Sequence, residues 1–392
     1  MPRPSRILRA AATALALAGC ADHPTEPESA LTPPVGGTSP ADPSASTGSK
    51  VVSSVAWNGT ARGLLTAQVA NPFVQVRVLT YLSLAQYNAI ITAENSKTQG
   101  PHPSAAGAAA GASVVVLKDF FPAQAQALED QIAAQTGEKE DFTAGEAIGR
   151  VVGAEVVAYA HGDNTGVLPA PPVPVGPGFW TSTAPLLGLF GTRPLALTSA
   201  DQFRPPPAPA FGSQAYLDAQ AEIRLLSDTR TPEQLAQAQF WNTRVAGYQN
   251  EIASELIASR GRSERNAASI LALANIAGFD ALIACWDAKF TYWYIRPSQA
   301  DPAITLPIGL PNHPSYPSAH SCVTAAYSEV LGHFFQDERP RLAANVEASG
   351  LSRMYGGIHY RFDIVAGRLL GRQVAEQVLA TDVTGPEPIP LD

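Results

Sequence analysis

Residues 289–297, KFTYWYIRP, begin a series of three polar segments in the last third of this 392-residue chain. The second segment is PSAH over 317–320, and the third is SRMYGGIHYRFD over 352–363. Lysine and arginine neutralise and hold an oxyanion, one imidazole can bond to its central atom, and a second imidazole can move a proton. The three segments therefore predict an oxyanion site in the C-terminal part of the chain.

The first segment contains Lys289 and Arg296, which are seven residues apart. A helix that ends at Pro297 would present both cations on one face, where they could hold one anion. A lysine and an arginine at this separation most often lie on a solvated face. Trp286 and Phe290, however, make this stretch too apolar for such a face. We therefore expect both cations to lie in a crevice.

The second segment precedes a helical pattern, so Ser318 and the backbone amides of Ala319 and His320 are expected at a helix N-terminus. Amides at such a position bind anions well. Ser318 could instead act only as an N-cap, and His320 could be a buried histidine whose hydrogen bonds are satisfied.

The third segment places Arg353 before a Gly-Gly pair that permits close backbone approach, with His359 and Asp363 predicted one turn apart on the final helix. Asp363 could then orient the ring of His359. Alternatively, Asp363 pairs with Arg361 or Arg368 on a solvated face.

Apolar residues recur at helical spacing from residue 51 onward, and no segment alternates like a sheet strand for long. The pattern predicts an all-α bundle with helices over 64–93 (interrupted at Pro72), 104–117, 123–135, 144–159, 213–226, 232–259, 263–294, 318–335, 339–349 and 358–379. Residues 162–212 are rich in proline and glycine. A loop of this length is expected to wrap the body or to border the opening of the site.

The three segments resemble the signature of the vanadium-dependent haloperoxidase and type 2 phosphatidic acid phosphatase superfamily: K-x6-R-P, then P-S-G-H, then S-R-x5-H-x3-D. The signature spans residues 289–363, and the helical pattern before it is similar to the long N-terminal half of the haloperoxidase-like branch. The resemblance implies an all-α helical bundle of the vanadium haloperoxidase and acid phosphatase type. Ala319 departs from the pattern, since the family usually has glycine there. The amide donor remains, but the added methyl group would crowd a bound oxyanion.

The resemblance also implies roles for individual residues. His359 would bond axially to the central atom and is thus the implied metal ligand, with vanadate as the cofactor and phosphate able to occupy the same site. The equatorial oxygens would be held by Lys289, Arg296, Ser318, Arg353 and the Ala319 amide.

Two enzymatic activities are compatible with this set of residues. In a haloperoxidase, similarity implies that hydrogen peroxide oxidises halide at vanadate held by His359, while His320 assists proton transfer. In a phosphatase, His359 would attack a small phosphomonoester to give a phosphohistidine, and His320 would protonate the leaving alcohol. His313 lies seven residues before His320, as an additional histidine does in bromoperoxidases, and favours bromide oxidation. A third hypothesis is a non-catalytic surface lipoprotein that binds phosphate. Ala319 is the best evidence for this hypothesis.

Residues 1–19 are predicted to be a signal peptide, because three arginines precede an apolar run. The run ends in Leu-Ala-Gly-Cys20, which resembles a bacterial lipobox, although a plain secretory signal is the alternative. We expect a periplasmic or cell-surface lipoprotein whose only membrane contact is a lipid on Cys20, since no later stretch has about 18 continuous apolar residues.

The remaining chain divides into a disordered Pro/Ser-rich tether over 20–50, a single all-α domain over 51–382 and a tail over 383–392. The formal net charge is −8, and about −11 without the signal arginines, which argues against a nucleic-acid partner. Cys285 and Cys322 both approach the predicted site. In an exported protein they could form a disulfide, or they could be small buried hydrophobic residues.

Overall fold

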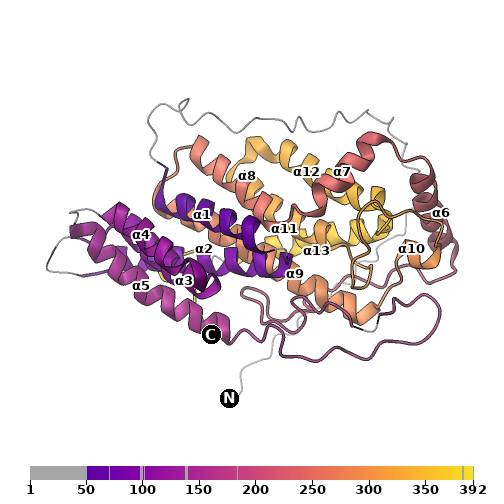
Figure 1. Ribbon diagram of the computed structural model, residues 1–392, viewed down its shortest axis with the longest axis horizontal. Helices are drawn as coiled ribbons and strands as arrows, with labels where there is room; N and C mark the ends of the chain where they lie inside the picture. The colour runs from indigo at the N-terminus through magenta and orange to yellow at the C-terminus, as the bar shows by residue number, and fades with distance from the viewer. Residues whose placement is uncertain are drawn as a thin grey trace, which may run out of the picture. The chain divides into compact units, whose positions relative to one another are not determined.

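The structure is a computed structural model that describes residues 51–69, 71–97, 100, 102–136, 140–182, 184–381 and 384–391. These residues form thirteen α-helices, two short 3-10 helices and no strand, so the predicted all-α class is confirmed (Figure 1). The predicted signal peptide, tether and Cys20 lie outside the described residues. The α-helices are α1 Ser53–Gln68, α2 Pro72–Glu94, α3 Ala105–Phe120, α4 Ala125–Thr136, α5 Glu140–His161, α6 Gln214–Asp228, α7 Pro232–Asn242, α8 Ala246–Ser259, α9 Glu264–Tyr292, α10 Pro297–Ala300, α11 Ala319–Phe334, α12 Arg339–Tyr355 and α13 Arg361–Ala380.

The central element is α9, a 29-residue helix that packs against α2, α11 and α13. It is apolar on nearly every side, as expected for a helix surrounded by others. Among the described residues it is the one helix long and apolar enough to cross a membrane, but 94% of its most apolar window is buried inside the protein. Its last turn carries Lys289 into the interior.

Glycines bring α13, which begins at the end of the third motif, close to α11, which begins within the second motif. A Cβ atom at Gly371 would lie 2.1 Å from the carbonyl oxygen of Cys322, and one at Gly367 would lie 2.6 Å from that of Ser318. Only glycine permits this approach. As a result, the backbone amide of Ser318 donates to the carbonyl oxygen of Asp363 (2.9 Å), which joins the beginnings of the two helices.

The proline- and glycine-rich segment over 162–212 wraps the body, as predicted. The carboxylate of Asp280 on α9 accepts hydrogen bonds from the amides of residues 195–197 at 2.7–3.0 Å. Further along, Leu186 donates from its amide to Asn312 (2.8 Å) and accepts from the Trp286 indole (3.2 Å). These bonds fix the segment beside the loop that precedes α11.

Several predicted helix boundaries were wrong. The pattern over 232–259 is two helices, because residues 243–245 leave the helical conformation between α7 and α8. The helix over 263–294 ends at Tyr292, because Trp293 takes the left-handed conformation (φ 50°) and packs on Trp180. The last helix begins at Arg361, so His359 lies before it rather than on it.

The C-terminal tail is packed against α2. The Tyr87 hydroxyl donates to the carbonyl oxygen of Gly385 (2.8 Å), and the side chain of Asn88 makes two hydrogen bonds to the backbone of Ile389 (2.9 and 2.8 Å). Ile389 itself is buried. The tail therefore extends the core beside α2, a helix of the N-terminal part of the chain.

Candidate active site

Five of the six charged or imidazole groups of the first and third motifs are buried, and Arg361 is the exposed one. Lys289 and Arg296 are 0% exposed, Arg353 1%, His359 3% and Asp363 0%. Long cationic side chains are almost never buried to this extent without partners. Their partners therefore define what the site can do.

Lys289 reaches from the last turn of α9 to the loop before α11. Its Nζ donates to the carbonyl oxygens of Pro314 (2.8 Å), Ser315 (2.8 Å) and Pro317 (2.6 Å). Three acceptors satisfy the three donors of an ammonium group. Lys289 therefore holds this loop in place and brings its charge to the site.

Arg296 lies beyond the end of α9, at the N-cap of α10, and not on the same helical face as Lys289 as predicted. Its guanidinium donates to the carbonyl oxygens of His313 (3.0 Å) and Ile358 (2.7 Å). Nη1 also lies 3.0 Å from Nε2 of His359, and Nη2 lies 3.0 Å from Nδ1 of His313. Trp293 ends α9 in the left-handed conformation, and the turn there brings Arg296 toward Lys289. Helical periodicity could not predict this turn.

The tautomer of His359 follows from its two neighbours. Oδ2 of Asp363 lies 2.8 Å from Nδ1, so Nδ1 carries the proton and donates it to the carboxylate. Nε2, facing the Arg296 donor, then presents its lone pair. Burial, together with the charges of Arg296 and Lys289, moves the pKa of His359 well below its usual value, so the ring is neutral.

Asp363 is held in turn by Ser315, whose hydroxyl donates to Oδ2 at 2.5 Å, and by the amide of Tyr360 (3.1 Å). Burial raises the pKa of Asp363 to about 6, so the carboxylate is ionised at neutral pH. Asp363 does not pair with Arg361 or Arg368, the alternative drawn from the sequence. The role of Ser315 was not predicted, because no residue pattern distinguishes this serine from its neighbours.

The second motif begins α11 as predicted. Ser318 is the N-cap and accepts from the Ser321 amide (3.5 Å), and the half-buried Ala319 packs its methyl group against the main core. His320 Nε2 lies 2.9 Å from the carbonyl oxygen of Trp241 on α7. Since a carbonyl only accepts, Nε2 carries the proton of this ring and Nδ1 has the lone pair. Burial lowers the pKa of His320 to about 3.

The same helix, α7, also holds Arg353. Nη2 of Arg353 donates to the carbonyl oxygen of Ala238 (2.8 Å), and Nε donates to the Ser352 hydroxyl (3.0 Å). No described hydrogen bond joins Arg353 or His320 to His359. His320 lowers the pKa of His359, Arg353 lowers that of His320, and Arg296 lowers that of Arg353. The carbonyls of α7 carried no signal in the sequence.

The cations outnumber the carboxylates in this interior. Burial lowers the pKa of Lys289 to about 8, of Arg353 to about 9 and of Arg296 to about 10, and Asp363 is the carboxylate that faces them. No group of three or more His, Cys, Asp or Glu residues that could hold a metal ion occurs in the described part of the chain. This donor set fits an oxyanion such as vanadate or phosphate, and not a bare metal cation.

Cys285 and Cys322 are both buried free thiols, so the disulfide that the sequence left open does not form in this structure. Cys285 Sγ donates to the carbonyl oxygen of Pro317 (3.7 Å), one of the acceptors of Lys289. The two thiols therefore pack behind the loop that Lys289 holds.

The depressed pKa of Lys289 gives a testable pH dependence. Between about pH 8 and pH 10.5 the unfolded chain binds a proton at Lys289 that the folded protein has released, so this residue makes stability rise with pH. We expect the increase in unfolding free energy over this window to be smaller in Lys289→Met than in the wild type. Urea unfolding at several pH values, without vanadate or phosphate, measures it. Equal slopes for the two proteins would contradict a depressed pKa.

The C-terminal segment of the chain is similar to known proteins. Residues 266–380 match the PAP2 superfamily. The decaprenylphosphoryl-5-phosphoribose phosphatases of Mycobacterium tuberculosis strains CDC 1551 and H37Rv are each 32% identical to this chain over 100 residues, which is 25% of this chain and 55% of the relative. The chain thus spans about half the length of the curated relatives it matches.

Solved structures resemble nearly the whole described chain. A bacterial vanadium-dependent iodoperoxidase, described as the first, has a TM-score of 0.72 at 24% identity, covering 84% of this chain and 97% of that one. A bacterial vanadium-dependent chloroperoxidase has TM-scores of 0.68 in its apo form and 0.65 in its holo form, each at 16% identity. The matches cover 80% and 82% of this chain and 96% and 94% of those chains. The chain therefore has the all-α fold of the vanadium haloperoxidases, and its region 266–380, which contains all three motifs, matches the PAP2 superfamily.

Proposed function

We propose that this protein is a vanadium-dependent haloperoxidase that oxidises halide, bromide in preference, with hydrogen peroxide. The observation that carries the proposal is the neutral His359, whose Nε2 lone pair faces the buried guanidinium of Arg296 and whose pKa is lowered by the charges of Arg296 and Lys289. These buried positive charges attract a multiply charged oxyanion to that nitrogen. The extent of the fold shared with haloperoxidases supports the peroxidase over the phosphatase.

Vanadate, when bound, would supply a Lewis-acidic centre that activates hydrogen peroxide. His359 would hold it through Nε2, while Arg296 and Arg353 neutralise its oxygens and Ser318 and the Ala319 amide donate to them. Asp363 keeps the proton on Nδ1, so the Nε2 lone pair, which accepts from Arg296 in this structure, would bond to vanadate once that guanidinium donates to the vanadate oxygens instead.

His320 would move protons through Nδ1, because its Nε2 proton is donated to α7. A negative charge brought into the cluster would raise the pKa of His320 from about 3 toward neutrality. This shift would make the ring an effective acid and base near neutral pH. His313 would contribute to the environment of the halide, since its ring lies against Trp286 (4.8 Å between ring centres) and beside Arg296.

Hydrolysis of phosphomonoesters is the alternative function, and the similarity to a mycobacterial phosphatase favours it. The same residues would serve: His359 Nε2 as the nucleophile and His320 as the acid for the leaving alcohol. Neither reaction requires a different arrangement of the chain.

A pair of assays separates the two functions. Purified protein, with and without vanadate, receives bromide, hydrogen peroxide and an organic halogen acceptor, and in parallel p-nitrophenyl phosphate. We expect vanadate to activate bromination and to inhibit any ester hydrolysis, since both anions compete for one site. Ester hydrolysis without bromination at every vanadate concentration would favour the phosphatase, and absence of both activities would favour the non-catalytic lipoprotein.

Export and lipid attachment at Cys20 are also part of the proposal and rest on residues 1–20 of the sequence alone. Metabolic labelling with a fatty-acid probe tests the attachment, and Cys20→Ser should lose the label. Label retained in that variant would rule the anchor out.

A further inference from the structure

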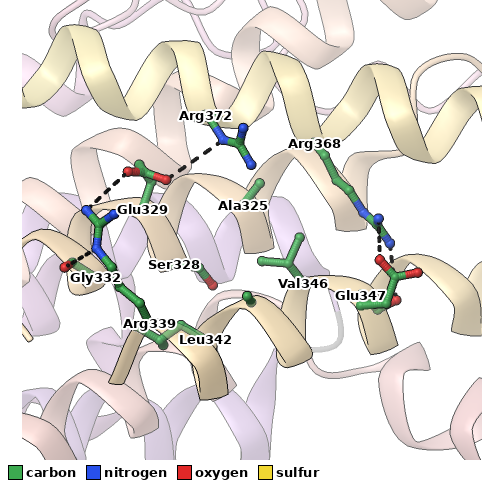
Figure 2. Close-up of a pocket in the computed structure, with 11 residues that line it drawn as sticks. Ala325, Ser328, Glu329, Gly332, Arg339, Leu342, Val346, Glu347, Arg368 and Arg372 are labelled. Atoms are coloured by element: carbon green, nitrogen blue, oxygen red, sulfur yellow. Dashed lines mark hydrogen bonds and ion pairs between the residues drawn. The ribbon is translucent and has the colours of Figure 1, made fainter. Parts of the chain in front are cut away.

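A second candidate site lies away from the proposed active site. A cavity of about 330 Å³ is bordered by α11, α12 and α13, and contains none of the residues discussed above as binding vanadate or phosphate (Figure 2). Its volume falls within the ~300–1,000 Å³ typical of small-molecule sites. It is lined by Ala325, Ser328, Glu329, Gly332, Arg339, Leu342, Ala343, Val346, Glu347, Arg368 and Arg372.

Two hydrogen-bonding groups of this cavity lack partners among the described residues. The Ser328 hydroxyl is buried, with the residue only 8% exposed, and Nε of Arg368 is buried as well. Figure 2 shows the Ser328 side chain extending from α11 among the other lining residues. Buried polar atoms are nearly always hydrogen-bonded. A rotation of the Ser328 side chain would let its hydroxyl donate to an oxygen acceptor in the cavity.

The charges of the cavity favour an anion. Three arginines face two glutamates, which leaves one positive charge in excess. Arg368 is held firmly by Glu347 (2.5 Å), whereas Arg339 and Arg372 share Glu329 at 3.7 and 3.9 Å, too far for good hydrogen bonds. Arg339 also donates to the Gly332 carbonyl oxygen (2.9 Å).

Of the three guanidinium groups, that of Arg372 therefore has the weakest contacts with its partners. Its described contact in the cavity is the long ion pair with Glu329, and 61% of its side chain is exposed. A guanidinium binds a carboxylate with two parallel hydrogen bonds, a geometry that the distant Glu329 does not supply. An incoming carboxylate could supply it.

The floor of the cavity is apolar, since Ala325, Leu342 and Val346 line it between the charged groups. An inorganic anion would leave this surface wet, whereas an organic acid would cover it. We propose that the cavity binds a small organic carboxylate with an apolar body, whose carboxylate pairs with Arg372 and accepts from the Ser328 hydroxyl. The proposal is independent of the function proposed above.

The ligand class can be tested by isothermal titration of the vanadate-saturated wild-type protein with three probes, because bound vanadate keeps the probe anions out of the proposed active site. Benzoate has the charge and the apolar body, benzamide has the body alone, and sulfate has the charge alone. We expect benzoate to bind at least tenfold more tightly than either of the others. Equal binding of benzamide would overturn the role of charge, and equal binding of sulfate would overturn the organic body.

Amino-acid substitutions test whether benzoate binds in this cavity. Arg372→Gln should weaken benzoate at least tenfold, and Ser328→Ala about three- to tenfold, as the loss of one hydrogen bond predicts. Arg361→Gln, an exposed arginine of the same helix that pairs with Glu222, is the matched control and should leave the affinity unchanged. Benzoate affinity that is unaffected by both cavity variants, or lowered equally by the control, would overturn the assignment.

Discussion

Replacing His359 with alanine is expected to lower the rate of bromide oxidation, or of ester hydrolysis, by about 10³-fold or more. The reason is that Nε2 of this ring presents the lone pair facing the buried cations, with its tautomer fixed by Asp363. Removing the ring takes away the proposed ligand of vanadium and the nucleophile of the alternative reaction together. Initial rates of both reactions, measured at several vanadate concentrations, provide the comparison.

His333→Ala is the control for this experiment, because His333 is an exposed histidine near the end of α11. Its rates should match those of the wild type. Near-ultraviolet circular dichroism of both variants should show native packing. A folded His359→Ala protein with wild-type rates would falsify the proposed role of this residue in either reaction.

Replacing Arg296 with methionine is expected to destabilise the protein by about 3–5 kcal/mol and to abolish activity. The change removes a donor from the carbonyl oxygens of His313 and Ile358, and each unsatisfied buried acceptor costs about 1–3 kcal/mol. It also relieves repulsion among three buried cations, which acts in the opposite direction. We expect the lost hydrogen bonds to dominate, because Arg296 makes them to both loops that carry the site.

Urea unfolding measures this effect, and Arg361→Met is the matched control. Arg361 is exposed and pairs with Glu222 at the surface, so its loss should change stability by less than about 1 kcal/mol. If Arg296→Met is as stable as the wild type or more so, repulsion between the cations outweighs the hydrogen bonds. The cluster would then be strained in the absence of an anion.

The helical class was predictable, and an oxyanion site could be proposed, because both depend on residue identity and local spacing. Apolar periodicity marks a helix wherever it falls, and the lysine, arginine and histidine types already indicate an oxyanion. Helix ends were less predictable. Trp293 ends α9 in a left-handed conformation because Trp180, more than a hundred residues earlier, packs on its ring and donates to its carbonyl oxygen.

The partners of each functional group were not predictable, because they are backbone atoms brought together by the fold. Lys289 was expected to hold an anion, and in the structure it satisfies its donors on three carbonyl oxygens of the loop before α11. His320 and Arg353 depend on carbonyls at the end of α7. Every residue has a carbonyl oxygen, so no sequence pattern marks the ones that accept hydrogen bonds from these side chains.

The sequence by itself determined that this chain forms helices and which side chains carry charge and imidazole groups. The tertiary structure alone decided that His359 is neutral, that its Nε2 is the nitrogen presented to the cations, and that Ser315 holds Asp363. The physical reason is that protonation state and tautomer depend on burial and on neighbours within hydrogen-bonding distance. Apart from Asp363, the neighbours of His359 come from the end of α9 and from the segment between α9 and α11, which are distant in the chain and adjacent only once the helices have packed.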